Sequence, residues 1–187
     1  MLRVDELPAS LLNAIKCFLL ACAARRIRKE GVVHNSMLIH VTRFTAVQGQ
    51  IKDLVERELR KLIARIMSGS DSLSDFENLW ETDFIPTSVI MSNKGFRDAI
   101  PTTTWNEIKR ELFNAAKTVK VKGINGEIGD ILDYRESDAL TREKIQRGEN
   151  VPWEDRGISV IAIGGDKLSR GLTLDGLTIS YYLRASR

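Results

Sequence analysis

The stretch ISVIAIGGDKLSRGLTLDGLTISYYLR, residues 158–184, decides the expected fold. It contains two largely apolar runs, residues 158–163 and residues 179–183, each with a single serine. Runs without polar alternation are typical of strands covered on both faces, as in parallel sheets. The loop between them gathers Asp, Lys, Ser and Arg beside glycines, a composition that suits anion binding. Taken alone, this loop can equally be interpreted as a purely structural connection, in which the glycines let the chain leave the strand and the Lys and Arg side chains are solvated.

The segments upstream extend the pattern into a repeating order of elements. Apolar stripes predict helices over residues 8–29, 45–69 and 138–147, and residues 37–42 and 119–124 read as further strands. The order strand, helix, strand, helix, strand predicts parallel βαβ units and therefore an α/β fold. In such sheets ligands bind at the carboxyl ends of the strands, where the loops emerge.

Residues 70–116 interrupt this order and read as a mostly helical insertion. Patterns of Ser or Thr followed three residues later by Glu or Gln predict capping boxes that start at Thr45, Ser74 and Thr104. The insertion is either a surface that contacts DNA or a partner, or a structural shell over the sheet. Trp80, Trp105 and Trp153 are candidates for stacking on bases, although Trp105 begins an apolar stripe and is expected in the core.

The composition restricts the class of protein but not its function. A chain of 187 residues has room for one core domain with an insertion. The balance of 28 Lys+Arg against 25 Asp+Glu is too even to indicate a nucleic-acid partner by itself. Cys17 and Cys22 lack a metal-ligand spacing, so we expect reduced thiols in a cytoplasmic protein. Asn13 and Lys16 interrupt the apolar segment 11–24, which therefore predicts neither a signal peptide nor a membrane span.

Two segments resemble a known family. SMLIHVTR (residues 36–43) and GGDKLSRGLTLDGLTISYYLR (residues 164–184) are similar to the Z1 domain family. Its members are helicase-related proteins of bacterial restriction-modification neighbourhoods, often labelled endonucleases. More broadly, the order of elements resembles the second RecA-like domain of superfamily-two helicases. The resemblance covers residues 5–67 and 118–187.

The resemblance implies a RecA-like parallel sheet flanked by helices, built from residues 5–69 and 117–187 around the insertion. It also implies that the chain is a piece of a longer ATP-dependent helicase or translocase from a restriction-modification or phage-defence system. ATP and Mg²⁺ would serve the full-length protein, because this sequence has no G-x-x-x-x-G-K-S/T phosphate loop. The expected partners are DNA, an N-terminal RecA-like domain of the same protein and restriction-modification proteins. The piece alone is not expected to hydrolyse ATP or to hold a metal.

The resemblance further assigns binding residues. The fourth helicase motif matches residues 40–43, and the fifth matches residues 165–171, with Gly165 where the usual motif has Thr. Those expected to bind nucleic-acid or phosphate groups are Thr42, Arg43, Gly164, Gly165, Lys167, Ser169, Arg170 and Gly171. Those expected to line a nucleotide cleft are Asp166, Thr173 and Arg184. Phosphate contacts carry no sequence information, so we expect non-specific binding.

Two other functions fit the same residues. One is a RecA-like domain without motor activity, which serves as a binding or scaffold module. The other is an endonuclease, because Glu107-Ile-Lys109 with Asp98 upstream formally matches an acidic-x-Lys metal element. Glu107 is equally the third residue of a capping box. His34 and His40 have no metal-ligand spacing, and His40 is expected as a satisfied core histidine.

Overall fold

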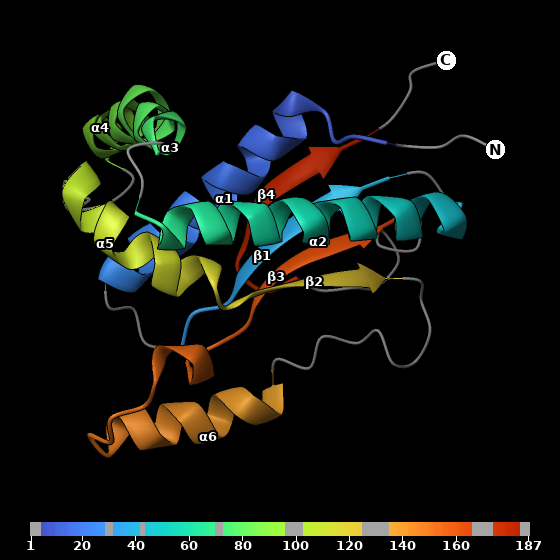
Figure 1. The fold of residues 1–187 in the computed structure, drawn as a ribbon. Helices are drawn as coiled ribbons and strands as arrows, with labels where there is room; N and C mark the ends of the chain where they lie inside the picture. The colour runs from blue at the N-terminus through green and yellow to red at the C-terminus, as the bar shows by residue number, and fades with distance from the viewer. Residues whose placement is uncertain are drawn as a thin grey trace.

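The computed structural model describes residues 5–28, 32–41, 44–69, 73–95, 103–124, 135–165 and 174–183. Four strands in these ranges form one parallel sheet in the order β2-β3-β1-β4 (Figure 1). The strands are β1 (Asn35–His40), β2 (Val119–Ile124), β3 (Ser159–Gly164) and β4 (Leu177–Tyr182). The expected α/β class is confirmed, and each predicted strand lies within a few residues of its place.

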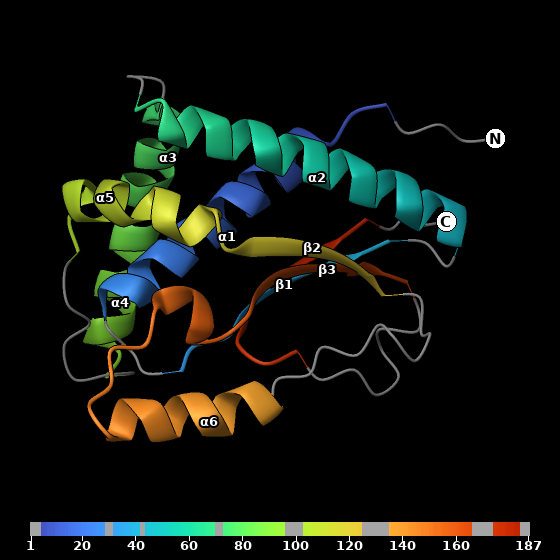
Figure 2. The ribbon, with the colours of Figure 1, turned by 60° about the horizontal axis from the view of Figure 1, so that its bottom comes forward.

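The helices flank the sheet on both sides and at one end. They are α1 (Ala9–Ile27), α2 (Thr45–Met67), α3 (Ser74–Leu79), the π-helical η1 (Trp80–Phe84), α4 (Ile85–Asn93), α5 (Trp105–Ala116), α6 (Arg135–Gln146) and the short 3-10 helix η3 (Trp153–Asp155). Figure 2 shows the sheet between α2 and α6, with α3, α4 and α5 gathered near the end where the strands begin. None of the described helices combines the length and the apolar character that crossing a bilayer requires.

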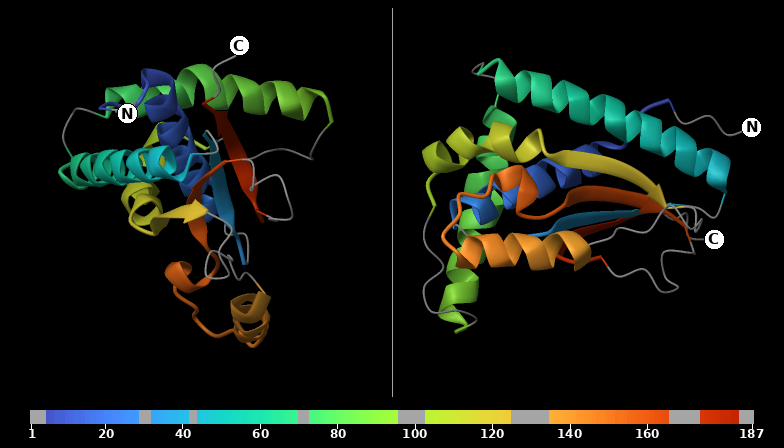
Figure 3. Two further views of the ribbon diagram at one scale, coloured as in Figure 1. Left: turned by 90° about the vertical axis from the view of Figure 1, so that its right-hand side faces the viewer. Right: turned by 90° about the horizontal axis from the view of Figure 1, so that it is seen from below.

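The register brings the last residues of all four strands to one edge of the sheet. Gly164 lies opposite His40 on one side and opposite Ile124 on the other. His40 in turn lies opposite Tyr182. We call the edge formed by Ile124, Gly164, His40 and Tyr182 the carboxyl edge; Figure 3 (left) looks onto it.

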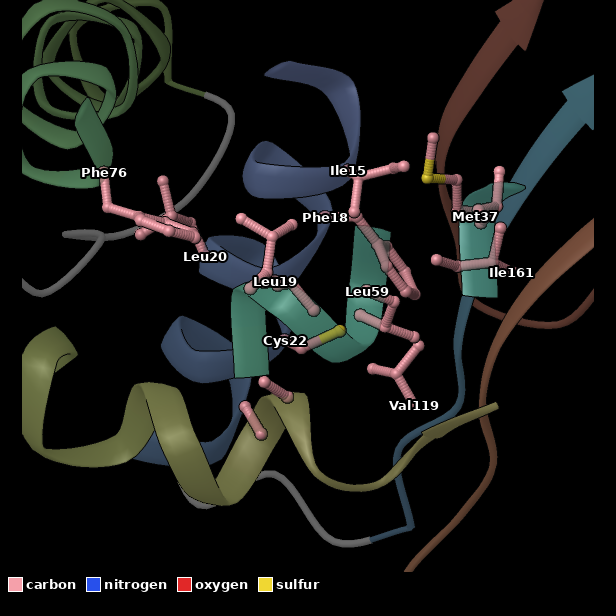
Figure 4. Packing of buried hydrophobic residues seen from close by; sticks show 14 of the residues in the cluster. Ile15, Phe18, Leu19, Leu20, Cys22, Met37, Leu59, Phe76, Val119 and Ile161 are labelled. Atoms are coloured by element: carbon pink, nitrogen blue, oxygen red, sulfur yellow. The ribbon is translucent and has the colours of Figure 1, made fainter. Parts of the chain in front are cut away.

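The main core lies between one face of the sheet and helices α1 and α2. Met37 and Ile161 are completely buried there, and Figure 4 shows them beside Ile15 and Phe18 of α1. Full burial of each such side chain contributes about 1.5–3 kcal/mol. Because α1 packs against both β4 and α5, it is apolar on more than one face, as its sequence requires.

The described parts of the predicted insertion, residues 73–95 and 103–116, share this core. Phe76, Trp80, Ile108 and Leu112 are buried in the same cluster as α1. The indole Nε1 of Trp80 donates a hydrogen bond to the carbonyl oxygen of Thr103 over 3.1 Å. These helices therefore act as a structural shell over α1, except for α4, none of whose residues is buried.

One predicted capping box is confirmed and two are wrong. Thr104 and Glu107 exchange the expected hydrogen bonds at the start of α5. Thr45 and Ser74 are instead the first helical residues of α2 and α3, and the capping positions belong to Phe44 and Leu73. At α2 the reason is that Phe44, rather than Thr45, has the extended backbone of a capping residue.

Candidate functional site at the carboxyl edge

The strand order creates a switch point between β1 and β3. These two strands are neighbours, but β1 leads through α2 towards β2 on one side, whereas β3 leads to β4 on the other. Where the connections of adjacent parallel strands leave in opposite directions, a crevice opens between the loops, and ligands bind there. Both segments that the sequence singled out, residues 40–43 and 164–171, start at this switch point.

Backbone hydrogen bonds hold the strand ends together beyond the last paired residues. The N–H of Val41 donates to the carbonyl oxygen of Gly164, and the N–H of Leu183 donates to that of His40, each over 2.8 Å. Gly164 and Gly165 are both buried. The ends of β1, β3 and β4 are therefore hydrogen-bonded to one another at the point from which the chain continues.

Gly164 and Gly165 are the predicted site residues that belong to the described ranges. The others lie outside those ranges: Thr42, Arg43, Asp166, Lys167, Ser169, Arg170, Gly171, Thr173 and Arg184. In the sequence, each of these segments follows directly from β1, β3 or β4. The structure thus fixes the strand ends that carry the predicted site.

Aromatic side chains at this edge were missed from the sequence. The ring of Tyr182 stacks on the ring of His40 with 5.3 Å between their centroids and 26° between their planes. His40 is 8% exposed, in line with its expected place in the core, whereas Tyr182 is 62% exposed and Phe44 is 60% exposed. Alternation along a strand predicts that Tyr181 and Tyr182 lie on opposite faces of the sheet, but it does not say which of them packs on α1.

The tryptophans proposed for base stacking pack against other side chains of the protein instead. Trp80 is only 4% exposed, and Trp105 packs against the main core. The guanidinium groups of Arg26 and Arg156 lie 5.0 Å and 4.7 Å from the ring centroid of Trp153. The stacking role predicted for these residues therefore finds no support in their surroundings.

A second polar cluster lies at the opposite end of the sheet. Nε2 of His34 lies 2.7 Å from Oδ2 of Asp138 on α6, and Nδ1 of His34 accepts the N–H of Ile158 over 3.1 Å. Because Nδ1 accepts a backbone N–H, the ring proton of neutral His34 lies on Nε2 and is donated to Asp138. Arg25 adds a hydrogen bond to the carbonyl oxygen of His34 over 2.6 Å. This cluster joins α1, β1 and α6.

A hollow of about 360 Å³ lies beside this cluster, between α6 and residues 149–158. It is far along the strands from the switch point, so this hollow and the topology indicate different places. We take the carboxyl edge as the candidate site because the topology and both sequence segments converge there. For the hollow, the shape is the single feature that would suggest a binding site.

The other residues that could take part in catalysis or bind a metal are either unreactive or already engaged in structural hydrogen bonds. Burial raises the pKa of the Cys22 thiol to about 12, which leaves no thiolate at neutral pH. The carboxylate of Glu107 accepts hydrogen bonds from the N–H and hydroxyl of Thr104, which lower its pKa. Asp98 lies outside the described ranges. Within those ranges, no group of three or more His, Cys, Asp or Glu residues is placed to hold a metal ion.

Comparison with known proteins identifies the family of this chain. The family model described as the Z1 domain matches residues 10–187, which include every element of the sheet and both segments at the switch point. No curated protein and no solved structure matches this chain.

Proposed function

Because this chain belongs to the Z1 domain family, we propose that it is the nucleic-acid-binding module of an ATP-dependent, helicase-like DNA-processing protein. In this proposal the carboxyl edge binds the sugar-phosphate backbone and forms one wall of an ATP cleft. The observation that carries the proposal is the switch point between β1 and β3. Both segments rich in hydroxyl and cationic side chains begin there.

The chemistry of these segments suits phosphate. Arg43 and Arg170 supply positive charge, and Thr42 and Ser169 supply hydroxyl donors, as phosphate oxygens require. Helix α2 starts at the same edge, without a side-chain cap and without an acidic residue in its first turn. The partial positive charge at a helix N-terminus adds to the attraction for an anion.

Because the two glycines are buried, the proposed site must change conformation before a phosphate can reach them. Gly164 and Gly165 are covered in this structure, so in this proposal a phosphate reaches their amides only after the residues that cover them move. A change in the position of a neighbouring domain at the cleft would supply that movement. The carboxyl edge would then hold nucleic acid differently in the open and the closed state.

ATP and Mg²⁺ would be held mainly by another part of the full-length protein. This sequence contains no phosphate loop, and no cluster of metal-ligating side chains occurs in the ranges that the structure describes. The residues of this chain that would line the cleft are Asp166, Thr173 and Arg184. An N-terminal RecA-like domain would supply the phosphate cradle and complete the cleft.

One observation favours a second function, that of a binding or scaffold module without motor activity. Helix α4 has no buried residue and exposes Val89, Ile90 and Met91. An apolar helix face of this kind is typical of a surface that contacts another protein. The carboxyl edge would then be a relic of the motor fold.

The experiment that separates these functions is ATP hydrolysis by the full-length protein, with no DNA, single-stranded DNA or duplex DNA. The 187-residue chain alone serves as a control. Hydrolysis that DNA stimulates in the full-length protein, and that is absent from the chain alone, supports the split motor site. Absence of hydrolysis in the full-length protein contradicts the proposal and favours the scaffold module.

A further inference from the structure

Tyr182 is an exposed aromatic residue that neither the core nor the proposed phosphate contacts use. It is 62% exposed at the end of β4, on the carboxyl edge. Its neighbour Tyr181 shows the contrast: its ring packs against the main core, and its hydroxyl lies 2.6 Å from Oγ of Ser10. The fold therefore accounts for Tyr181 and leaves the position of Tyr182 to be explained.

The sheet holds the ring of Tyr182 in place. Tyr182 lies opposite His40 in the parallel ladder, and the next residue, Leu183, donates its N–H to the carbonyl oxygen of His40 over 2.8 Å. The ring of Tyr182 rests on the His40 ring at 5.3 Å and 26°. His40 is 8% exposed and therefore supports the Tyr182 ring from the buried side, whereas Tyr182 itself is 62% exposed.

A supported aromatic ring with one open face is the arrangement on which unpaired bases stack. Every base has a π-face, so such stacking tolerates any sequence, and it adds to backbone contacts. A ring that the protein already holds in place loses little conformational entropy when a base binds. A base inside a duplex is stacked on its neighbours and is not available to such a ring.

We propose that Tyr182, supported by His40, stacks on an unpaired base, so that the carboxyl edge binds single-stranded nucleic acid in preference to duplex. This inference rests on the proposed function, because it names the kind of nucleic acid that the same edge binds. In this proposal Tyr182 makes the edge prefer single-stranded over duplex nucleic acid, whereas the cationic segments bind the phosphates of both.

The test measures fluorescence anisotropy of three labelled DNA molecules mixed with the 187-residue chain. They are a thymidine oligonucleotide, a duplex of the same length and an oligonucleotide whose sugars carry no bases. The protein variants are Tyr182→Ala, Tyr182→Phe and, as a control, Leu177→Ala, which is 46% exposed at the other end of the same strand. Thermal unfolding of each variant checks that the sheet is intact.

We expect Tyr182→Ala to weaken binding of the thymidine oligonucleotide by about 5- to 150-fold, the range for loss of one stacked base. Tyr182→Phe keeps the π-face and should bind like the wild type. The duplex and the strand without bases should bind Tyr182→Ala and the wild type about equally. Leu177→Ala should change none of the three affinities.

Three results would overturn the inference. Equal binding of the thymidine oligonucleotide by the wild type and Tyr182→Ala removes the stacking role and leaves the proposed function intact. An equal loss on all three DNA molecules assigns the effect to phosphate contacts or to the fold, which again removes the stacking role alone. Failure of the wild-type chain to bind any of the three contradicts the proposed function, and the inference with it.

Discussion

The backbone N–H of Val41 donates a hydrogen bond to the carbonyl oxygen of Gly164 over 2.8 Å. This bond joins β1 to β3 at the switch point, where the chain continues into Thr42-Arg43 on one strand and into Gly165-Asp166 on the other. The sheet itself therefore sets the spacing at which the two segments begin. The proposed phosphate site depends on that spacing, and hence on the stability of the core beneath the sheet.

Ile161→Ala should lower the free energy of unfolding by about 2–5 kcal/mol. Ile161 is completely buried in the centre of β3, so the change removes apolar contacts and leaves a cavity. Urea unfolding followed by circular dichroism measures the effect. Ile90→Ala is the matched control, because Ile90 is 52% exposed and its loss should change stability by less than about 0.5 kcal/mol. Equal effects of the two variants would contradict the assignment of the core.

Thr104→Ala should destabilise the chain by about 1 kcal/mol, because it removes the cap of α5. Thr45→Ala is the control: Thr45 has the same Thr-x-x-Gln/Glu pattern but is the first helical residue of α2 and caps nothing. Its replacement should have little effect in the same urea titration. A larger loss at Thr45 than at Thr104 would show that the capping position of α2 is assigned wrongly.

Asp75→Asn should reduce stability at neutral pH by about 1 kcal/mol, a small value because solvent partly screens the carboxylate. Burial alone would raise the pKa of Asp75, but hydrogen bonds from Lys16 and Arg65 outweigh it and lower the pKa. Lys16 Nζ lies 2.7 Å and Arg65 Nη2 lies 2.8 Å from Oδ2 of Asp75. These contacts join α3 to α1 and α2.

The sign of the pH dependence follows from that lowered pKa. The carboxylate stabilises the folded state at pH values above the unfolded pKa of about 4, and the contribution is lost as the pH falls through the folded-state pKa. The difference in stability between the wild type and Asp75→Asn should therefore shrink below about pH 4. A difference that stays constant from neutral to acidic pH would exclude this ion-pair network as its source.

Asp138→Ala should loosen α6 and cost about 1–3 kcal/mol, because it removes the acceptor of the buried His34 Nε2–H. Hydrogen exchange of the α6 amides should become faster, while exchange in β1 and β3 should change less. Arg147→Ala provides the control, since the pair of Arg147 with Glu143 is exposed on the same helix and should contribute less than about 0.5 kcal/mol. Unchanged exchange in α6 would show that the contact with His34 does not hold the helix.

Local patterns predicted most of the sheet but not its contacts. The apolar runs of β1 and β3 are visible in the sequence because both strands are buried. Helix α4 was not predicted, because Val89, Ile90 and Met91 are exposed and form too short an apolar segment to show a helical stripe. The hydrogen bond from His34 to Asp138 spans 104 residues, so no local pattern contains it.

The sequence predicted where the candidate site lies but not the aromatic residues beside it. The glycine pair after β3 and the parallel order of elements predict a site at the carboxyl edge, and its binding residues stay a prediction. The exposure of Tyr182 depends on β4 being an outer strand, which follows from the strand order and not from the sequence of β4. Tyr181 and Tyr182 are consecutive residues of the same type. Only the pairing of β4 within the sheet decides which of them packs against the core and which is exposed.

The most direct test of the central claim is the salt dependence of binding between this chain and single-stranded DNA. A plot of the logarithm of Kd against the logarithm of salt concentration should be linear, and Arg43→Ala and Arg170→Ala should each reduce its slope by about 0.7. The double variant Lys120→Ala/Lys122→Ala is the control, because both lysines are exposed on the outer strand β2, and its slope should equal that of the wild type. Slopes that Arg43→Ala and Arg170→Ala leave unchanged would contradict phosphate binding at the carboxyl edge.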